Sequence, residues 1–97
     1  MRIRWSDRAR DDFYAIITSI AEDENNAEAA VRVHNRLQEA IEHLARHPEM
    51  GCPGRVDGTR ELVLSDIGYI LPYRVRGQYL EIAAILRASR RWPESFD

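Results

Sequence analysis

The sequence contains no lysine and only one cysteine, and each shortage narrows what the protein can be. All fourteen basic residues are arginines, which favour planar, bidentate contacts with carboxylates or phosphates and also stack on aromatic rings. The lone Cys52 excludes an internal disulfide, and no spacing of His and Cys resembles a metal site. We therefore expect no metal and no other cofactor, and a reducing cytoplasm fits the cysteine usage best.

Long apolar runs and targeting segments are also missing. No run approaches the roughly 20 apolar residues that a membrane span requires. The N-terminal sequence MRIRWSDRAR has no apolar signal-peptide core. We therefore expect a cytoplasmic protein without a membrane partner. With 97 residues, 44% hydrophobic and 31% charged, the chain is predicted to form one small globular domain over residues 1–97.

The charges are unevenly distributed along the chain. The formal net charge is −2, so the protein as a whole does not have the basic balance of a nucleic-acid-binding protein. Residues 1–50 hold seven arginines against ten acidic residues, whereas residues 51–97 hold seven against six. The second half is therefore the more basic one, and we expect anion-binding residues to lie there.

The stretch that organises the chain is residues 79–86 (YLEIAAIL). It is almost continuously apolar and follows a glycine, which predicts a central strand buried on both faces. The end of this strand brings together Arg87, Arg90, Arg91 and Trp92, and Trp92 is expected to pack back onto the body of the domain. This cluster is either a binding site or a solvated, arginine-rich chain end, and the cluster alone does not decide between them.

The first half of the chain predicts a strand followed by a helical hairpin. Residues 1–5 alternate between apolar and polar as a short strand does, and Ser6 is a good N-cap for a helix over residues 7–23. An asparagine in the following turn caps a second helix, Ala27–Arg46, which Pro48 ends.

The second half predicts a Gly/Pro-rich loop over residues 50–59 and then strands at Arg60–Leu64, Tyr69–Arg76 and residues 79–86. Pro72 cannot donate to a ladder, so its strand is expected to be bulged there or to have that nitrogen facing outward. The order β-α-α-β-β-β predicts an α+β fold, with the helical hairpin on one face of a small, mostly antiparallel sheet.

No motif of enzyme chemistry is present, since the chain lacks a phosphate loop, a nucleophile elbow and a zinc-binding HExxH. Arg60 begins one strand and Arg74 lies near the end of the next, so antiparallel pairing brings them to the same end of the sheet. Guanidinium groups there would bind a phosphate or an acidic protein segment. The alternative is structural, with Arg60 paired to Glu81 or another sheet carboxylate. The candidate target-binding residues are Arg60, Arg74, Arg87, Arg90, Arg91 and Trp92.

Several short motifs follow one another along almost the whole chain. In order, they are Trp5, Ala9 and Asp12; Leu44, Pro48 and Gly51; the GTREL of residues 58–62; Tyr69 and Ile70 with the YRV of residues 73–75; and Ile85, Leu86, Arg90, Trp92 and Pro93. Together they resemble the RelE/ParE superfamily, the toxins of type II toxin–antitoxin systems. The resemblance implies a growth inhibitor that a cognate antitoxin neutralises by wrapping across its helices and sheet, as a hetero-oligomer.

The resemblance leaves the target open. RelE-like members cleave mRNA on the ribosome with basic residues, whereas ParE-like members act on DNA gyrase without such a site. Glu61, Val63 and Ile70 stand where RelE-like enzymes carry basic residues, and Arg87 stands where many relatives carry a histidine. We therefore expect a ParE-like gyrase inhibitor that is not an enzyme. The alternatives are a ribosome-dependent endoribonuclease using Arg74, Arg87, Arg90 or Arg91, or a degenerate member that binds its antitoxin without toxicity.

Overall fold

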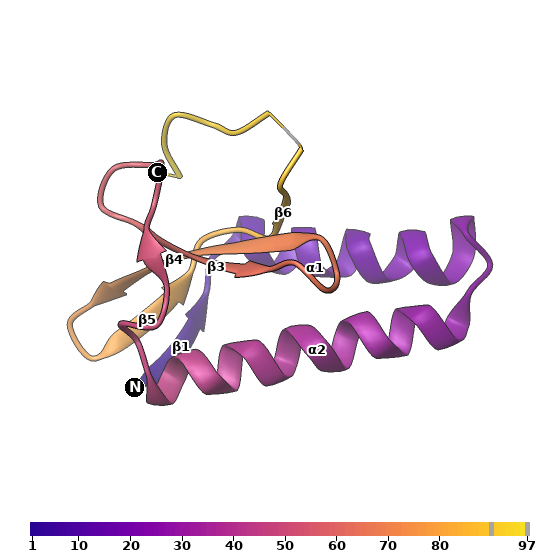
Figure 1. Ribbon diagram of the computed structural model, residues 1–97, viewed down its shortest axis with the longest axis horizontal. Helices are drawn as coiled ribbons and strands as arrows, with labels where there is room; N and C mark the ends of the chain where they lie inside the picture. Colours follow the sequence, from indigo (N-terminus) through magenta and orange to yellow (C-terminus); the bar gives the residue numbers. More distant parts are fainter. Residues whose placement is uncertain (90, 97) are drawn as a thin grey trace.

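A computed structural model describes residues 1–89 and 91–96, so the predicted role of Arg90 lies outside the described residues. Figure 1 shows two helices running side by side from one end of the molecule, next to a curled sheet. The elements in chain order are β1 (Arg2–Trp5), α1 (Asp7–Thr18), the π-helical turn η1 (Ser19–Asp23), α2 (Ala27–Arg46), β2 (Cys52–Pro53), β3 (Arg60–Leu64), β4 (Tyr69–Arg76), β5 (Tyr79–Ile82) and β6 (Leu86–Arg87).

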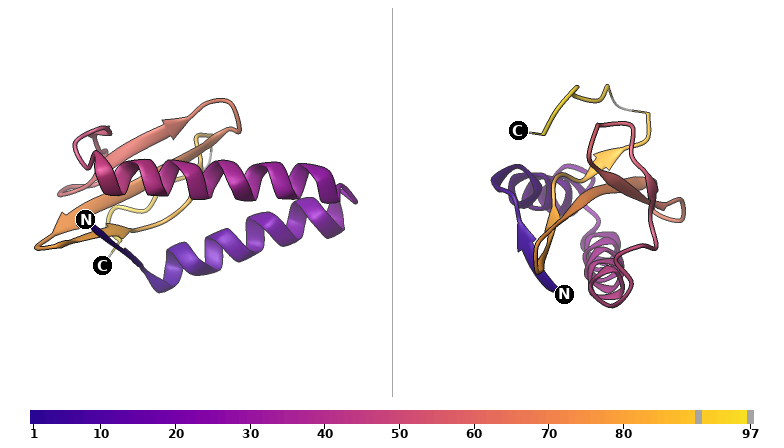
Figure 2. Two further views of the ribbon diagram at one scale, coloured as in Figure 1. Left: turned by 90° about the horizontal axis from the view of Figure 1, so that it is seen from below. Right: turned by 90° about the vertical axis from the view of Figure 1, so that its left-hand side faces the viewer.

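The strands form one sheet in the order β1-β5-β4-β3-β2, and β6 pairs with the start of β4. β1 runs parallel to β5, and every other pairing between the described strands is antiparallel. The helices lie on one side of the sheet, and the C-terminal tail passes on the other (Figure 2). This arrangement confirms the predicted α+β fold, with a helical hairpin on a mostly antiparallel sheet.

The helix boundaries follow from their caps. The Ser6 hydroxyl accepts a hydrogen bond from the Ala9 amide at 2.9 Å, and the Asn26 side chain accepts one from Ala29 at 3.0 Å. Both side chains satisfy amides that have no partner within their own helix. The predicted first helix is correct in extent but ends in a π-helical turn, in which the amide of Glu24 donates to the carbonyl of Ser19 at 3.1 Å. The predicted bounds of the second helix are confirmed.

The prediction of one strand over residues 79–86 is wrong, because the chain leaves the sheet after Ile82 and returns at Leu86. The side chains of Ser6 and Asp12 form hydrogen bonds with backbone groups of the residues between β5 and β6. The Ser6 hydroxyl donates to the carbonyl of Ala83 at 2.8 Å, and the Asp12 carboxylate accepts from the amide of Ile85 at 2.9 Å. β5 is central as predicted, but its outward residues are half-buried.

Replacing Asp12 with alanine is expected to lower the free energy of unfolding by about 1–2 kcal/mol, because the buried Ile85 amide then has no acceptor. Urea unfolding followed by circular dichroism measures the loss. The matched control is Asp11→Ala, which removes an exposed carboxylate from the same helix. Asp12→Asn keeps an acceptor oxygen and should recover most of the stability. Equal midpoints for the Asp11 and Asp12 alanine variants would rule out this role for Asp12.

Pro72 lies in β4 beside the gap between β5 and β6, where no strand is adjacent to β4 on that side. Its carbonyl accepts from the amide of Ala83 at 2.9 Å. In a strand the nitrogen and carbonyl of one residue point to the same side, so the Pro72 nitrogen faces the gap between β5 and β6. β4 keeps a continuous register with β3 and Pro72 is fully buried, so neither the expected bulge nor an outward-facing nitrogen occurs. The predicted loop 50–59 is less open than expected, since β2 pairs with β3 there.

The core lies between the helices and one face of the sheet. No helix in residues 1–89 and 91–96 is long and apolar enough to cross a membrane. The buried residues of the helices pack against inward-facing strand residues, and the cluster comprises Ala9, Leu37, Ala40, Ile41, Leu44, Leu64, Tyr69, Leu71, Tyr73, Leu80, Ile82 and Ile85.

Candidate functional site

The structure divides the candidate arginines between the two ends of β4. Arg60 pairs with Tyr73 near the end of this strand, next to Arg74, whereas Arg87 pairs with Tyr69 at its beginning. Four residues of strand, about 13 Å, separate these positions. Arg60 and Arg74 share one end of the sheet as expected. They lie on opposite faces, however, because consecutive residues of a strand alternate.

The two strand arginines each have a structural partner. Arg60 donates through Nη2 to the carbonyls of Glu49 at 2.9 Å and Gly51 at 2.5 Å, which ties the loop before β2 to the sheet. Arg74 donates through Nε to Glu81 at 2.7 Å. The alternative that Arg60 pairs with Glu81 is therefore wrong, since the partner of Glu81 is Arg74.

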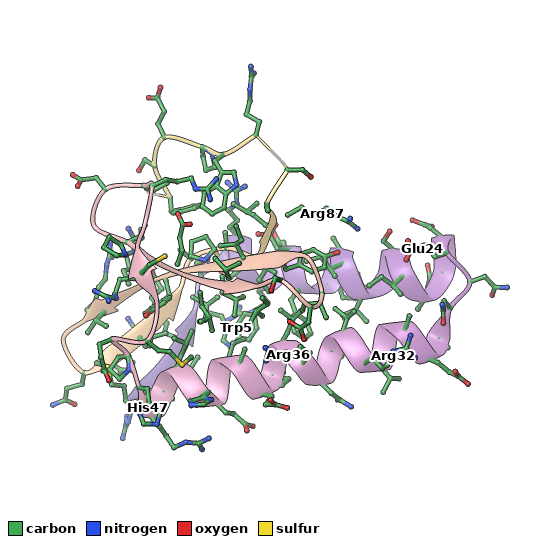
Figure 3. All side chains as sticks on the ribbon, viewed as in Figure 1. Trp5, Glu24, Arg32, Arg36, His47 and Arg87 are labelled. Atoms are coloured by element: carbon green, nitrogen blue, oxygen red, sulfur yellow. The ribbon has the colours of Figure 1, made fainter. Side chains whose placement is uncertain are left out.

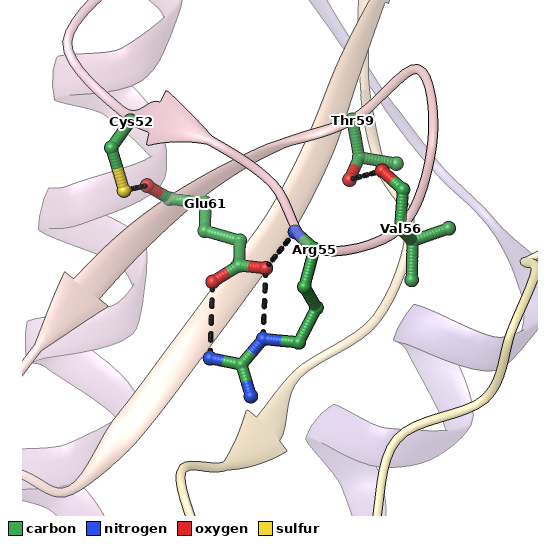
Figure 4. A network of polar contacts seen from close by, with 5 residues as sticks. All are labelled: Cys52, Arg55, Val56, Thr59 and Glu61. Atoms are coloured by element: carbon green, nitrogen blue, oxygen red, sulfur yellow. Dashed lines mark hydrogen bonds and ion pairs between the residues drawn. The ribbon is translucent and has the colours of Figure 1, made fainter.

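A buried carboxylate organises the loop between β2 and β3 (Figure 4). Glu61 is 5% exposed, so its charge needs partners. Its Oε2 accepts from the backbone amide of Arg55 at 2.7 Å and from Arg55 Nε at 3.2 Å, and its Oε1 accepts from Arg55 Nη2 at 3.3 Å. Our sequence analysis missed Arg55. An acidic residue inside the apolar strand Arg60–Leu64 was the signal that a basic partner was needed.

The tail packs back onto this loop, as predicted for Trp92. The guanidinium carbon of Arg55 lies 3.8 Å from the centre of the Trp92 ring, a cation–π contact. Phe96 lies 6.4 Å from Trp92 and 5.6 Å from the guanidinium of Arg8, so the tail reaches α1. The Trp92 Nε1 atom is buried and has no hydrogen-bond partner among residues 1–89 and 91–96.

Arg87 is the exposed member of the candidate set at the other end of β4, and Arg91 is exposed in the tail. The Arg87 guanidinium lies 5.2 Å from the centre of the Tyr69 ring. Figure 3 shows it beside α1. It borders a cavity of about 460 Å³ that Ser19, Tyr69 and Ser89 also line. A cation beside hydroxyl groups suits an anionic group of a partner.

A further ion pair joins α2 to the turn between β3 and β4. Arg36 Nε donates to Asp66 Oδ2 at 2.7 Å, and this hydrogen bond lowers the pKa of Asp66 below its usual value. A lowered carboxylate pKa stabilises the fold above the unfolded value, and the contribution is lost as the pH falls through the folded value. Because Asp66 is exposed, we expect the effect to be small.

The side chains described above hold loops in place or offer charge to a partner protein. In the described part of the chain, no group of three or more His, Cys, Asp or Glu side chains is placed to hold a metal ion. The polar contacts around Glu61 and Arg60 hold loops, and the exposed arginines offer charge to a partner. The fold and these surfaces define a class of small α+β proteins in which a helical hairpin covers one face of a sheet.

Comparisons with known proteins identify the family within this class. The family model for the ParE toxin of type II toxin–antitoxin system, parDE, matches residues 3–92. The chain is 43% identical over 93 residues to "Putative toxin Y4kP" of Sinorhizobium fredii (strain NBRC 101917 / NGR234), spanning 96% of this chain and 94% of that relative. It also matches the structure titled "Chromosomal ParDE TA system from P. aeruginosa" with a TM-score of 0.79 and 27% identity, over 90% of this chain and 95% of that one.

The chain therefore belongs to the ParE toxin family of type II toxin–antitoxin systems. The predicted resemblance to the RelE/ParE superfamily, on its ParE side, is confirmed. The family implies an antitoxin as the partner of this toxin.

Proposed function

We propose that this toxin inhibits DNA gyrase in the cytoplasm and that its cognate antitoxin neutralises it in a hetero-oligomer. The observation that best supports gyrase as the target is the burial of two residues on the face of the sheet opposite the helices. Glu61 is 5% exposed and Ile70 is 3% exposed. These two residues stand at positions where, by the resemblance, RelE-like enzymes carry basic residues. A buried carboxylate and a buried isoleucine cannot contact a scissile phosphate, which argues against the ribonuclease alternative.

The target-binding role stays with the exposed arginines. Arg87 and Arg91 are solvent-exposed, and Trp92, the residue after Arg91, is held in the tail by its contact with Arg55. Arg60 and Arg74 serve this function indirectly by holding the loop and the sheet. We propose that Arg87, beside its cavity, makes the main polar contact with the target.

The antitoxin surface is proposed to be the exposed side of the helical hairpin, together with the sheet edges. Tyr14 is 74% exposed on α1 and Val31 is 57% exposed on α2, so each helix presents an apolar side chain to solvent. A cavity of about 320 Å³ between the helices is lined by Trp5, Phe13 and Tyr14. An amphipathic segment that folds on binding would cover these groups.

Pulse labelling of DNA, RNA and protein synthesis after induction of the toxin alone tests the target. We expect DNA synthesis to fall first, because gyrase inhibition stops replication before it depletes ribosomes. Arg87→Ala should weaken growth inhibition while antitoxin binding, measured by calorimetry, is retained. Arg32→Ala, on the exposed face of α2, is the control for toxicity.

Three results would contradict these proposals. Translation stopping first would replace gyrase with the ribosome and its mRNA as the target, and the exposed arginines would become catalytic candidates. Normal synthesis in cells with abundant folded protein would identify a degenerate member that binds its antitoxin only. Loss of both toxicity and antitoxin binding in Arg87→Ala would show that Arg87 is structural.

A further inference from the structure

Two of the three histidines lie together where α2 ends. The ring centres of His43 and His47 are 5.1 Å apart, and the ring planes are inclined at 59°. Both residues are solvent-exposed. His47 is the residue that caps the helix, and Figure 3 labels it there. Its backbone has left the helical conformation, with φ −136° and ψ 70°, so the structure, and not helical spacing alone, brings the two rings together.

The backbone holds the two histidines one turn apart. The amide of His47 donates to the carbonyls of His43 at 2.9 Å and Leu44 at 3.2 Å. The chain beyond them is tied to the sheet, because the hydroxyl of Tyr73 donates to the carbonyl of Pro48 at 2.6 Å. The backbone positions of the pair are therefore fixed before any ligand binds.

The two imidazoles are available to a ligand. Neither ring forms a hydrogen bond or an ion pair with any of residues 1–89 and 91–96. A neutral imidazole has one ring nitrogen with a lone pair that accepts a proton, a hydrogen bond or a metal ion. Imidazole nitrogen suits zinc, copper and nickel, whereas magnesium and calcium prefer oxygen ligands.

The separation of the rings matches that of two imidazoles on one metal ion. With a metal–nitrogen distance of about 2.1 Å, each ring centre lies roughly 3.2 Å from the metal, so two ring centres are about 4.5 Å apart at a right angle and about 5.2 Å apart at a tetrahedral angle. The observed 5.1 Å lies within this range. We propose that His43 and His47 together bind a divalent transition-metal ion of the zinc type, with water in the remaining positions. This inference is independent of the gyrase proposal.

The end of α2 favours a cation. A helix of 20 residues has its negative dipole end at this point, which stabilises positive charge. Glu39 is exposed one turn before His43 and adds a carboxylate to the same stripe of the helix. Its ion pair with Arg36 is long, at 3.9 Å. Arg46 has the opposite effect, but its exposed side chain can extend into water away from the ion.

Two protein ligands make an exchangeable site. Structural zinc sites use four protein ligands and catalytic ones use three, and in the described part of the chain no group of three or more such side chains is placed to hold a metal ion. The ion therefore binds according to its supply, and it stabilises the folded state by joining the last turn of α2 to the residue that caps it. This revises our expectation of no metal, because the pairing of the two rings is visible only in the structure.

Calorimetric titration of zinc chloride into the purified full chain, with Cys52→Ser as the parent, tests the proposal. The serine removes the exposed thiol, which would compete for the ion. We expect about one ion per chain. His43→Gln and His47→Gln should each weaken binding at least about tenfold, since even a change outside the ligand set costs that much at metal sites. The matched control is His34→Gln, which removes the third histidine, also from α2, and should leave the affinity unchanged.

Two further measurements locate the ion. In proton NMR spectra the ring signals of His43 and His47 should shift together during the titration, while those of His34 stay in place. Excess zinc should raise the thermal midpoint of the parent by about 4–8 °C and leave both glutamine variants unchanged. Affinity should increase from cobalt to nickel to copper, and magnesium should not bind.

Three results would overturn the proposal. The first is an affinity in His43→Gln or His47→Gln equal to that of the parent. The second is a loss in His34→Gln as large as in His43→Gln, which would show adventitious binding by scattered histidines. The third is the absence of both heat and NMR shifts in a parent with a native circular dichroism spectrum. Growth inhibition is a separate readout that decides the gyrase proposal.

Discussion

Replacing Tyr73 with alanine is expected to lower the free energy of unfolding by about 3–5 kcal/mol, which is enough to unfold much of a marginal domain. The ring is fully buried in the core. Its hydroxyl accepts from the amide of Gly51 at 2.9 Å and donates to the carbonyl of Pro48 at 2.6 Å. The substitution therefore leaves a cavity and also releases the chain between α2 and β2. Urea denaturation followed by circular dichroism measures the loss.

Tyr73→Phe isolates the hydroxyl, and we expect a loss of about 1–3 kcal/mol from the unsatisfied Gly51 amide. The matched control is Tyr14→Phe, which removes a hydroxyl from an exposed ring. This control should stay within about 0.5 kcal/mol of the wild type. Gly51 itself cannot carry a side chain, since a Cβ there would lie 2.7 Å from the carbonyl oxygen of Glu61. A Tyr73→Phe variant as stable as the Tyr14→Phe control would contradict the role of the hydroxyl.

Replacing Glu61 with alanine is expected to lower the free energy of unfolding by about 2–3 kcal/mol. Breaking a buried ion pair costs more when the remaining charge stays buried. Here Arg55 is half-exposed, with 48% of its side chain accessible, so water compensates part of the loss. The cost arises from the Arg55 amide, which loses its acceptor, and from the space that the carboxylate filled. Thermal and urea unfolding both report this change.

The Glu61 variant should also loosen the tail, because Arg55 carries the Trp92 ring. In a Trp5→Phe background, Trp92 is the one remaining tryptophan, and its fluorescence should shift towards that of an exposed indole. Glu42→Ala, which removes an exposed carboxylate from α2, is the control for stability. Unchanged Trp92 emission in Glu61→Ala would mean that the tail is held independently of this network.

The local elements were predictable because local signals specify them. Ser6 and Asn26 are both good N-caps, Pro48 ends a helix, and the strands at Arg60–Leu64 and Tyr69–Arg76 have apolar patterns bounded by turn residues. The strand over residues 79–86 was overextended because an apolar run does not reveal where the backbone changes partners. The carboxylate of Asp12, far away in the sequence, decides that point.

The candidate site was predictable only in part. The sequence correctly indicated that Trp92 packs back, and the end of the sheet shared by Arg60 and Arg74 followed from antiparallel pairing. The hydrogen-bond and ion-pair partners of Arg60 and Arg74 were not predictable, because the two side chains lie on opposite faces of the sheet. Successive side chains of a strand point to opposite faces, so the partners depend on the exact register. Neither was Arg55, since its role depends on how the loop folds over Glu61.

The sequence by itself determined the two helices, the strands at Arg60–Leu64 and Tyr69–Arg76, the α+β class and the resemblance that the family comparison confirmed, because periodicity, caps and turns act over a few residues. Only the tertiary structure decided which charged side chains meet. The parallel pairing of β1 with β5 sets Arg2 and Arg4 beside Tyr79 and Glu81, opposite Arg74 and Arg76. That pairing joins segments more than seventy residues apart, and it depends on the burial of Ile3, Trp5, Leu80 and Ile82 against one core, which no local pattern records.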